Sequence, residues 1–306
     1  MKKLLAAALT GGIFALIVVA QFPPARKHTP NQSKIVTALV PATGSTTTAS
    51  KFEMEIKGSE RIIQANGIPN HKVGAFPNRG NPHRIAPQRY YYRIPAKPEL
   101  SGRITPLELG NFGIAVNGVP FDPGAAEWYL GVRNSEWRYE ALSDAVPLGI
   151  DANYAHVQPT GAYHYHGVPT GLMTVLKVRP DQHSPIIGWA ADGFPIYALY
   201  GYSKSDSAQS AIVTLKSSYR VKLGTRPTGR GAPGGRYDGT FTADYEYVKD
   251  LGDLDECNGR FCVTPDFPEG TYAYFLTKDW PIIPRAYHGK PSNDFQRKKL
   301  PPKGKK

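Results

Sequence analysis

Glycine and proline are spread through almost the whole chain, and together they account for nearly a fifth of its residues. The 306 residues include 31 glycines and 28 prolines, whereas the two make up about 12% of an average protein. They lie between short segments that are rich in tyrosine and valine, and both residue types interrupt helices and mark turns. This distribution predicts many turns and few long helices, and it excludes a helical bundle.

Four short motifs have the same form, in which a polar residue and a glycine are followed by an apolar residue and a proline. The glycine allows a tight turn, and the proline forces the residue before it into an extended conformation. We therefore expect strands that fold back at intervals, although the unequal spacing of the motifs excludes a regular structural repeat. The motifs are Asn66-Gly-Ile-Pro69, Asn117-Gly-Val-Pro120, His166-Gly-Val-Pro169 and Asp192-Gly-Phe-Pro195.

Stretches of alternating or β-rich composition recur over residues 51–296 and predict a mostly β fold. We expect one domain of antiparallel sheets, arranged as a sandwich or a barrel, with one or two short helices. The alternatives are an α+β fold and a division into two lobes near residue 180 or 205. Ser135–Ser143 is the best candidate for a helix, and Ser207–Leu215 is a weaker one. The predicted strands lie in Lys51–Ile63, Tyr90–Ile94, Phe112–Val116, Gly161–His166, Leu172–Val178, Ile186–Ala190 and Thr271–Thr277.

The first twenty residues have the pattern of an export signal. Lys2 and Lys3 precede an uncharged apolar run from Leu4 to Ala20, and Val18 and Ala20 are the small residues that a signal peptidase requires before its cleavage site. We expect cleavage after Ala20 and hence a periplasmic or secreted protein. An uncleaved anchor is the alternative, although the apolar run is short for a bilayer. No other stretch approaches the length of a membrane span.

The formal net charge of +12 is concentrated at the two ends of the chain. Residues 21–50 are rich in Pro, Thr, Ser and Ala and contain no acid, which predicts a linker. The charge run over residues 297–306 predicts a basic, solvated and disordered tail. Basic and acidic residues nearly balance over the expected domain, residues 51–296, so binding to nucleic acid is not implied.

Two cysteines, Cys257 and Cys262, enclose the sequence Asn258-Gly259-Arg260-Phe261. Asn-Gly strongly favours a two-residue hairpin turn, which would bring the two sulfurs together. Because an exported protein folds in an oxidising environment, we expect a disulfide, with a thiolate metal site as the alternative. The spacing is not Cys-x-x-Cys, so thioredoxin-like chemistry has no support.

Three of the eight histidines fall within eleven residues. His164 and His166 project from the same face of an extended segment, while Tyr163 and Tyr165 project into the core on the other face. The loop after His156 is long enough to bring that residue over the histidine face. Neutral imidazoles are common ligands of copper and zinc, so the pattern predicts a transition-metal site that contains all three histidines. The alternative is a hydrogen-bonded structural cluster.

Two further residues are candidates for the same site. Asp192 is the leading acid; it would ligate the metal or orient an imidazole, or else serve as a turn residue that bonds its own backbone. His71 is a candidate for a fourth nitrogen ligand. His83, His183 and His288 lie in turns or loops without a spacing that suggests ligation.

Several catalytic signatures are missing from the sequence. It has no Gly-x-Ser-x-Gly elbow, no phosphate-binding loop and no dinucleotide fingerprint, so nucleotide-driven chemistry is not expected. A metal-dependent hydrolase or lyase and a metal-sequestering protein both fit the sequence, and Tyr163 or Tyr165 would donate a proton only if turned toward the metal. The rival class is a non-catalytic scaffold module for a cell-envelope polysaccharide. No catalytic residue is assigned.

The tetrapeptide Tyr163-His164-Tyr165-His166 is the one for which the YHYH domain family is named, and the sequence resembles that family over roughly residues 62–285. Blocks similar to other family motifs follow in order along this range. The resemblance implies an exported protein of bacterial or marine type, and it implies no particular reaction. All five candidate metal-site residues lie within these motifs. The blocks are Asn66 to His71, Asn117 to Pro120, Asp151 to Pro159, Gly188 to Tyr197, Leu254 to Arg260 and Thr264 to Tyr272.

Overall fold

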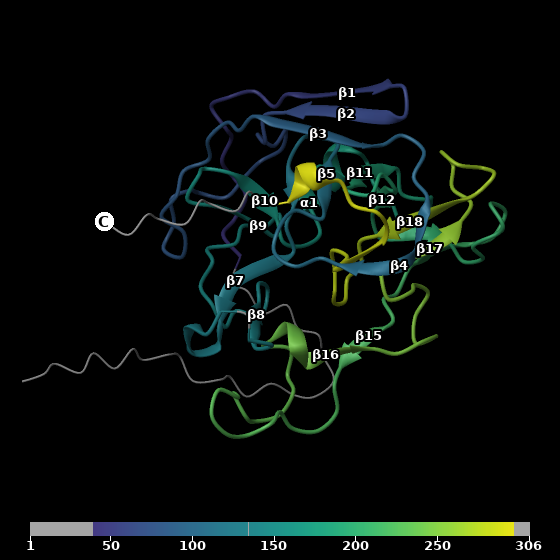
Figure 1. The fold of residues 1–306 in the computed structure, drawn as a ribbon. Helices are drawn as coiled ribbons and strands as arrows, with labels where there is room; N and C mark the ends of the chain where they lie inside the picture. Colours follow the sequence, from purple (N-terminus) through teal and green to yellow (C-terminus); the bar gives the residue numbers. More distant parts are fainter. Residues whose placement is uncertain (1–38, 134, 297–306) are drawn as a thin grey trace, which may run out of the picture.

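The computed structural model describes residues 39–133 and 135–296 (Figure 1). In this part of the chain short strands predominate, accompanied by one α-helix, α1 (Thr170–Val175), and three 3-10 turns, η1 (Tyr129–Gly131), η2 (Thr242–Asp244) and η3 (Asn293–Phe295). The predicted mostly β fold is confirmed. The sheets are open, however, and none closes into a barrel.

The central sheet is built from eight strands that come from distant parts of the sequence: β5 (Gly113–Ala115), β6 (Pro120–Phe121), β9 (Ala155–Val157), β10 (Tyr163–Tyr165), β11 (Ile186–Ala190), β12 (Pro195–Tyr197), β17 (Gly259–Cys262) and β18 (Thr271–Phe275). Their order is β17-β18-β12-β11-β5-β6-β10-β9. Most neighbours are antiparallel, but β6 pairs with β10 and β12 pairs with β18 in parallel. In Figure 1, β9 and β10 lie toward the end of this sheet that is farthest from β17.

A second sheet contains three antiparallel strands, β1 (Phe52–Lys57), β2 (Glu60–Ala65) and β3 (Tyr90–Pro95). The predicted strand region Lys51–Ile63 is therefore a hairpin, which turns at Gly58 with φ +61°. Burial on β3 alternates, because one face packs on the core while the other faces solvent.

Four two-stranded ribbons complete the fold, and Figure 1 shows two of them, β7–β8 and β15–β16, on the side opposite β1. They pair β4 (Leu100–Pro106) with β19 (Ala286–Gly289), β7 (Gly124–Trp128) with β8 (Arg138–Glu140), β13 (Tyr200–Tyr202) with β14 (Ile212–Thr214), and β15 (Tyr219–Val221) with β16 (Tyr245–Tyr247).

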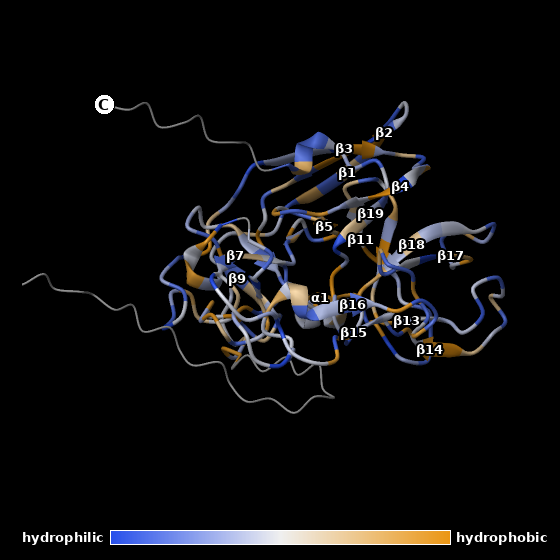
Figure 2. Cartoon of the chain, turned by 60° about the horizontal axis from the view of Figure 1, so that its bottom comes forward, coloured by the Kyte–Doolittle hydropathy of each residue, from blue (hydrophilic) through white to orange (hydrophobic). Residues whose placement is uncertain are grey.

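Large aromatic side chains fill the core. Hydrophobic and hydrophilic segments follow one another closely along the chain in Figure 2, as expected for short strands with one buried face. The pair β5–β11 joins strands on either side of residue 180, and the pair β12–β18 joins strands on either side of residue 205. The largest fully buried side chains include Tyr163, Tyr165, Tyr197, Tyr274, Phe112 and Phe121.

Neither predicted helix forms. The segment 135–143 contains strand β8, and the segment 207–215 contains strand β14; conversely, α1 occupies most of the predicted strand Leu172–Val178. Distant partners explain the first difference: Trp137 packs on Phe241 with ring centroids 5.7 Å apart, and Glu140 accepts hydrogen bonds from Trp280 and Arg285. Such contacts outweigh the weak helix propensity of a short segment.

The expected disulfide is wrong: Cys257 and Cys262 are both free and buried. The turn at Asn258 precedes strand β17 and does not close a hairpin between the cysteines, because the chain from Gly259 to Cys262 pairs with β18. The extended strand separates the two sulfurs and places them in different hydrophobic clusters.

Part of the expected linker contacts the domain. Val40 pairs with Asp151, and Gly44 pairs with Val73 through two backbone hydrogen bonds of 2.9 and 3.0 Å. The expected signal segment and the basic tail lie outside the described residues, and the proposed domain boundaries stay predictions. Within residues 39–133 and 135–296, the structure has no helix with the length and apolar character of a membrane span.

Candidate metal centre

The hairpin of β9 and β10 places His156 directly opposite His164. Cross-strand neighbours share a face of the sheet, and residues two apart on a strand do too, so His166 joins the same face. The hairpin turns at Gly161, where φ is +84° and a Cβ atom would lie 2.5 Å from the Cβ of Ala86. Glycine is therefore required at this turn.

The three imidazoles meet at one point. Ring centroids are 4.6 Å apart for His156 and His164 and 4.7 Å apart for the other two pairs, and Nε2 of His164 lies 3.0 Å from Nε2 of His166. One nitrogen from each ring lies within 4.8 Å of the others. Nitrogens that share one tetrahedral zinc ion are about 3.3 Å apart. Changes of up to about 1.5 Å in the distances between these nitrogens would therefore bring them to the spacing that a common ion requires.

Backbone carbonyls fix the orientation of these rings. Nδ1 of His156 donates to the Leu148 carbonyl at 2.9 Å, and Nδ1 of His164 donates to the Ala162 carbonyl at 3.1 Å. The Pro123 carbonyl also interacts with His166, but Nδ1 of His166 makes no hydrogen bond within normal distance and angle limits. With the Nδ1 protons so placed, Nε2 of His156 and of His164 carries the lone pair that a metal would accept.

Burial favours the neutral form of His156 and His166. His164 and His166 are each 2% exposed, and His156 is half-buried. Removal from water, and secondly the neighbouring His164, lower the pKa of His156 to about 3. Burial, followed by His156 and His164, also holds the pKa of His166 well below its ordinary value. Neutral imidazole is the form that binds metal ions.

The tyrosines of the same strand point to the opposite face and anchor it there. The Tyr163 hydroxyl donates to Asp151 Oδ2 at 2.7 Å and accepts from Asn153 at 3.2 Å. Burial raises the pKa of both phenols far above the neutral range. The Tyr163 hydroxyl is bonded to Asp151 and the Tyr165 hydroxyl to His71, so neither hydroxyl faces the three clustered imidazoles.

His71 lies on this tyrosine face and is not part of the imidazole group. Its Nδ1 lies 2.8 Å from the Lys72 carbonyl, which can only accept, so Nδ1 carries the proton. Its Nε2 accepts from the Tyr165 hydroxyl at 2.6 Å, and Asn117 donates to the same hydroxyl at 2.9 Å. The sequence-predicted fourth nitrogen thus supports the strand from behind.

Asp192 also lies away from the three histidines. It follows β11, which is separated from β10 by two strands and hence by about 14 Å. Its carboxylate accepts from the Tyr274 hydroxyl at 2.6 Å, from Gly289 N–H at 3.0 Å and from Phe194 N–H at 3.4 Å. Burial raises its pKa to about 6. The contact with Phe194 fits the interpretation of Asp192 as a turn residue. Of the five predicted site residues, the structure thus brings together three.

Two residues beside the imidazoles were missed by the sequence interpretation. Asp122, 1% exposed, directly follows β6, and Gln158 directly follows β9. Gln158 Nε2 donates to Asp122 Oδ2 at 3.2 Å. For Gln158 the signal was its spacing of two from His156; for Asp122 only the position after the Asn117-Gly-Val-Pro120 motif pointed to it.

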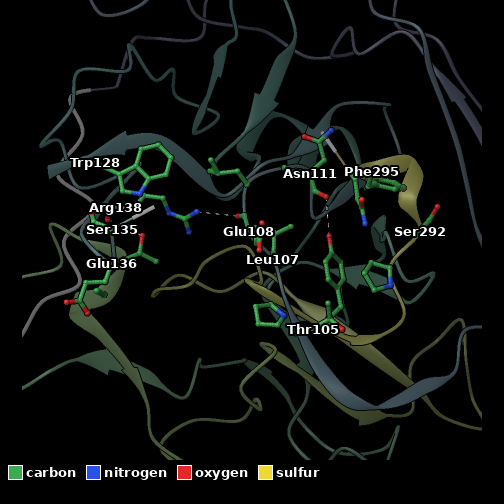
Figure 3. A pocket seen from close by; sticks show the side chains of 18 residues that line it. Thr105, Leu107, Glu108, Asn111, Trp128, Ser135, Glu136, Arg138, Ser292 and Phe295 are labelled. Carbon is green, nitrogen blue, oxygen red and sulfur yellow. Dashed lines mark hydrogen bonds between the residues drawn. The ribbon is translucent and has the colours of Figure 1, made fainter. Parts of the chain in front are cut away.

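A large cavity of about 1060 Å³ lies elsewhere, between the segment 105–111, ribbon β7–β8 and the segment 291–296. None of the three histidines lines it. Figure 3 shows Trp128 and Arg138 together at one end and Phe295 at the other. Arg138 donates to the Glu108 carbonyl at 3.3 Å. Aromatic faces and charged groups thus share this cavity.

Comparison with known proteins gives one match. No curated protein and no solved structure is similar to the sequence. A family model described as YHYH protein matches residues 91–289, which include the three clustered histidines and Asp192 but not His71. The match covers well over half of the chain and agrees with the resemblance in the tetrapeptide. The chain therefore belongs to the YHYH protein family.

Proposed function

We propose that this protein binds one transition-metal ion, copper or zinc, through the imidazoles of His156, His164 and His166. One distance supports this assignment above all, the 3.0 Å between Nε2 of His164 and Nε2 of His166 in a buried site. If Nδ1 carries the proton in both rings, two lone pairs face each other, which is unfavourable unless a cation lies between them. If His166 instead donates from Nε2, its buried Nδ1 becomes an acceptor without a partner.

The donor set suits either ion. Neutral imidazole is a good ligand for both copper and zinc, and three such ligands leave a position for water or substrate. With zinc, acidification of the bound water would permit hydrolysis or a lyase reaction on a small-molecule substrate. With copper, sequestration or redox chemistry is the expected role. Tyr163 and Tyr165 are excluded as proton donors at the metal because both hydroxyls face the other way.

We further propose that the protein acts in the periplasm or outside the cell. The support is the N-terminal pattern of two lysines, an apolar run and small residues at positions 18 and 20. Fractionation of cells that express the full chain, with N-terminal sequencing of the exported product, tests this directly. A chain that stays in the cytoplasm with Met1 in place would contradict it.

Metal content after reconstitution tests the binding function. The exported protein is incubated with Zn²⁺ or Cu²⁺, desalted, and analysed for metal and protein. We expect one ion per chain, and far less than one in a His164→Ala/His166→Ala double variant. His183→Ala is the matched control, because His183 is also buried but lies in another part of the fold. Substoichiometric metal in the unsubstituted protein with both ions would contradict the proposal.

A second candidate function is that of a non-catalytic binding module for a cell-envelope polysaccharide. The cavity of about 1060 Å³ favours it, because the Trp128 ring lines it beside Glu108, Glu136 and Arg138. Calorimetric titration with a panel of envelope oligosaccharides would detect such binding, and Trp128→Ala should weaken it at least tenfold. Binding of no oligosaccharide in the panel would count against this role.

A further inference from the structure

Asp122 is a buried carboxylate on the same face of the sheet as the imidazoles. Phe121 pairs in parallel register with Tyr165, and their ring centroids lie 5.7 Å apart, so both side chains lie on the face opposite the histidines. Because successive side chains alternate between faces, the side chain of Asp122 shares the face of His164 and His166. Its N–H donates to the Tyr165 carbonyl at 2.9 Å, which fixes this position.

Gln158 reaches the same carboxylate from the other side of β10. It lies two residues after His156 on a chain that remains paired with β10, because its N–H donates to the Ala162 carbonyl at 3.0 Å. Strands β9 and β6 flank β10, so the hydrogen bond of 3.2 Å from Gln158 to Asp122 crosses β10 on the histidine face. The amide, the carboxylate and the imidazoles therefore form one polar layer.

The charge of this layer matters because water is largely excluded. A dication held by three neutral imidazoles brings two positive charges into a buried site, which is costly without a compensating negative charge. Asp122 is 1% exposed, and attraction at low dielectric is much stronger than in water.

We propose that Asp122 is the positioning and charge-compensating residue of the metal centre, and that it makes the centre selective for a divalent over a monovalent cation. Gln158 holds the carboxylate in place on this face. Because Coulomb energy is proportional to the charge of the ion, Asp122 stabilises a dication about twice as much as a monocation at the same position. A group that only supports the fold would affect both ions equally.

The test compares three ions in two carboxamide variants of the exported protein. Asp122→Asn should lower the affinity for Zn²⁺ and Cu²⁺ by about 10- to 100-fold, as is usual for outer-shell carboxylates. The affinity for Cu⁺ should fall by only the square root of that factor, about 3- to 10-fold. Competition with chromophoric chelators measures each affinity. Asp192→Asn is the matched control, equally buried at 1% exposure, and should leave all three affinities within threefold.

A second variant guards against misfolding of Asp122→Asn. Gln158 is half-buried, so Gln158→Lys should fold, and its ammonium group would offset the Asp122 charge and weaken Zn²⁺ and Cu²⁺ more than Cu⁺. Equal losses for Cu²⁺ and Cu⁺, or unchanged affinities in a folded variant, would overturn the inference.

The role of Asp122 rests on the proposed function, so the experiment must distinguish a failure of metal binding from a failure of the Asp122 role. If the unsubstituted protein takes up no metal, both are wrong. If it takes up one ion that depends on His164 and His166 but not on Asp122, only the present inference is wrong.

Discussion

Nε2 of His164 and Nε2 of His166 lie 3.0 Å apart, and both side chains are almost fully removed from water. A contact of this length between two buried imidazoles needs a proton or a cation between the nitrogens. His156 approaches both rings from the neighbouring strand, which makes a cation the better fit. The consequences can be measured without knowledge of the reaction.

Bound metal should stabilise the folded state. An ion that binds only the native protein adds about 2.7 kcal/mol to the free energy of unfolding at a free concentration of 100 times Kd. We expect Zn²⁺ or Cu²⁺ to raise the melting temperature and EDTA to reverse the rise, as measured by differential scanning fluorimetry. The His164→Ala/His166→Ala variant should show no shift; an equal shift there would place the ion elsewhere.

The Tyr165→Phe variant should destabilise the protein with little effect on the metal. Loss of the hydroxyl leaves Nε2 of His71 without its donor and removes one of the two acceptors of Asn117, which keeps its bond to Asn70 Oδ1, at a cost of about 1–3 kcal/mol. Urea denaturation would measure this cost. Tyr91→Phe is the matched control, because Tyr91 is 53% exposed. A large loss of metal affinity without a loss of stability would show that the tyrosine face does more than support the strand.

Gly161→Ala should impair both the fold and the site. The new Cβ would meet Ala86 at 2.5 Å in a residue with φ +84°, and we expect a loss of about 1–3 kcal/mol. Metal affinity should also fall, because the turn at Gly161 sets His156 opposite His164. Gly102→Ala is the control, with φ +71° but no atom within 4 Å of its Cβ, so its cost should be smaller. Equal losses of stability in Gly161→Ala and Gly102→Ala would show that the neighbours of residue 161 move to accommodate the new Cβ.

Asp192 should make stability depend on pH. Its pKa is raised to about 6 by burial, whereas an Asp in the unfolded chain titrates near 3.8, so the folded protein binds more protons between these values. Its contribution to stability is complete below about pH 3.8 and is lost as the pH rises through 6. Relative to Asp192→Asn, the unsubstituted protein should lose about 2.4 kcal/mol between pH 4 and pH 7.5. Urea denaturation across this range measures the difference; parallel curves would refute the assignment.

Both cysteines should be reduced in the purified protein. Cys257 and Cys262 are buried in different clusters, and burial raises the pKa of each thiol, so they should react slowly in the native state. In denaturant without reductant we expect two alkylated thiols per chain by mass spectrometry. A mass two units lower with no alkylation would show a disulfide and hence a different path for this segment.

Local patterns predicted the features that depend on neighbouring residues. The alternation of tyrosine and histidine on β10 follows from the two-residue period of a strand, and the short turn at Gly161 brings His156 back over the same face. The partners of His71 and Asp192 are set by pairing between remote strands, which no local spacing reveals. Asp122 was missed for the same reason, because its proximity to the imidazoles depends on the parallel pairing of β6 with β10.

Strand β10 is only three residues long, yet its two faces have opposite requirements. A shift of register by one residue, caused by an insertion or deletion between Gly161 and His166, would turn the phenol rings toward His156. The imidazoles would then point toward Asp151 and His71. Both faces would then lose their interactions at once, because the neighbours of the phenol rings cannot replace the neighbours of the imidazoles, and the reverse holds too. The length of this segment is therefore as constrained as its composition. Insertion or deletion of one codon there should be as damaging as loss of the histidines themselves.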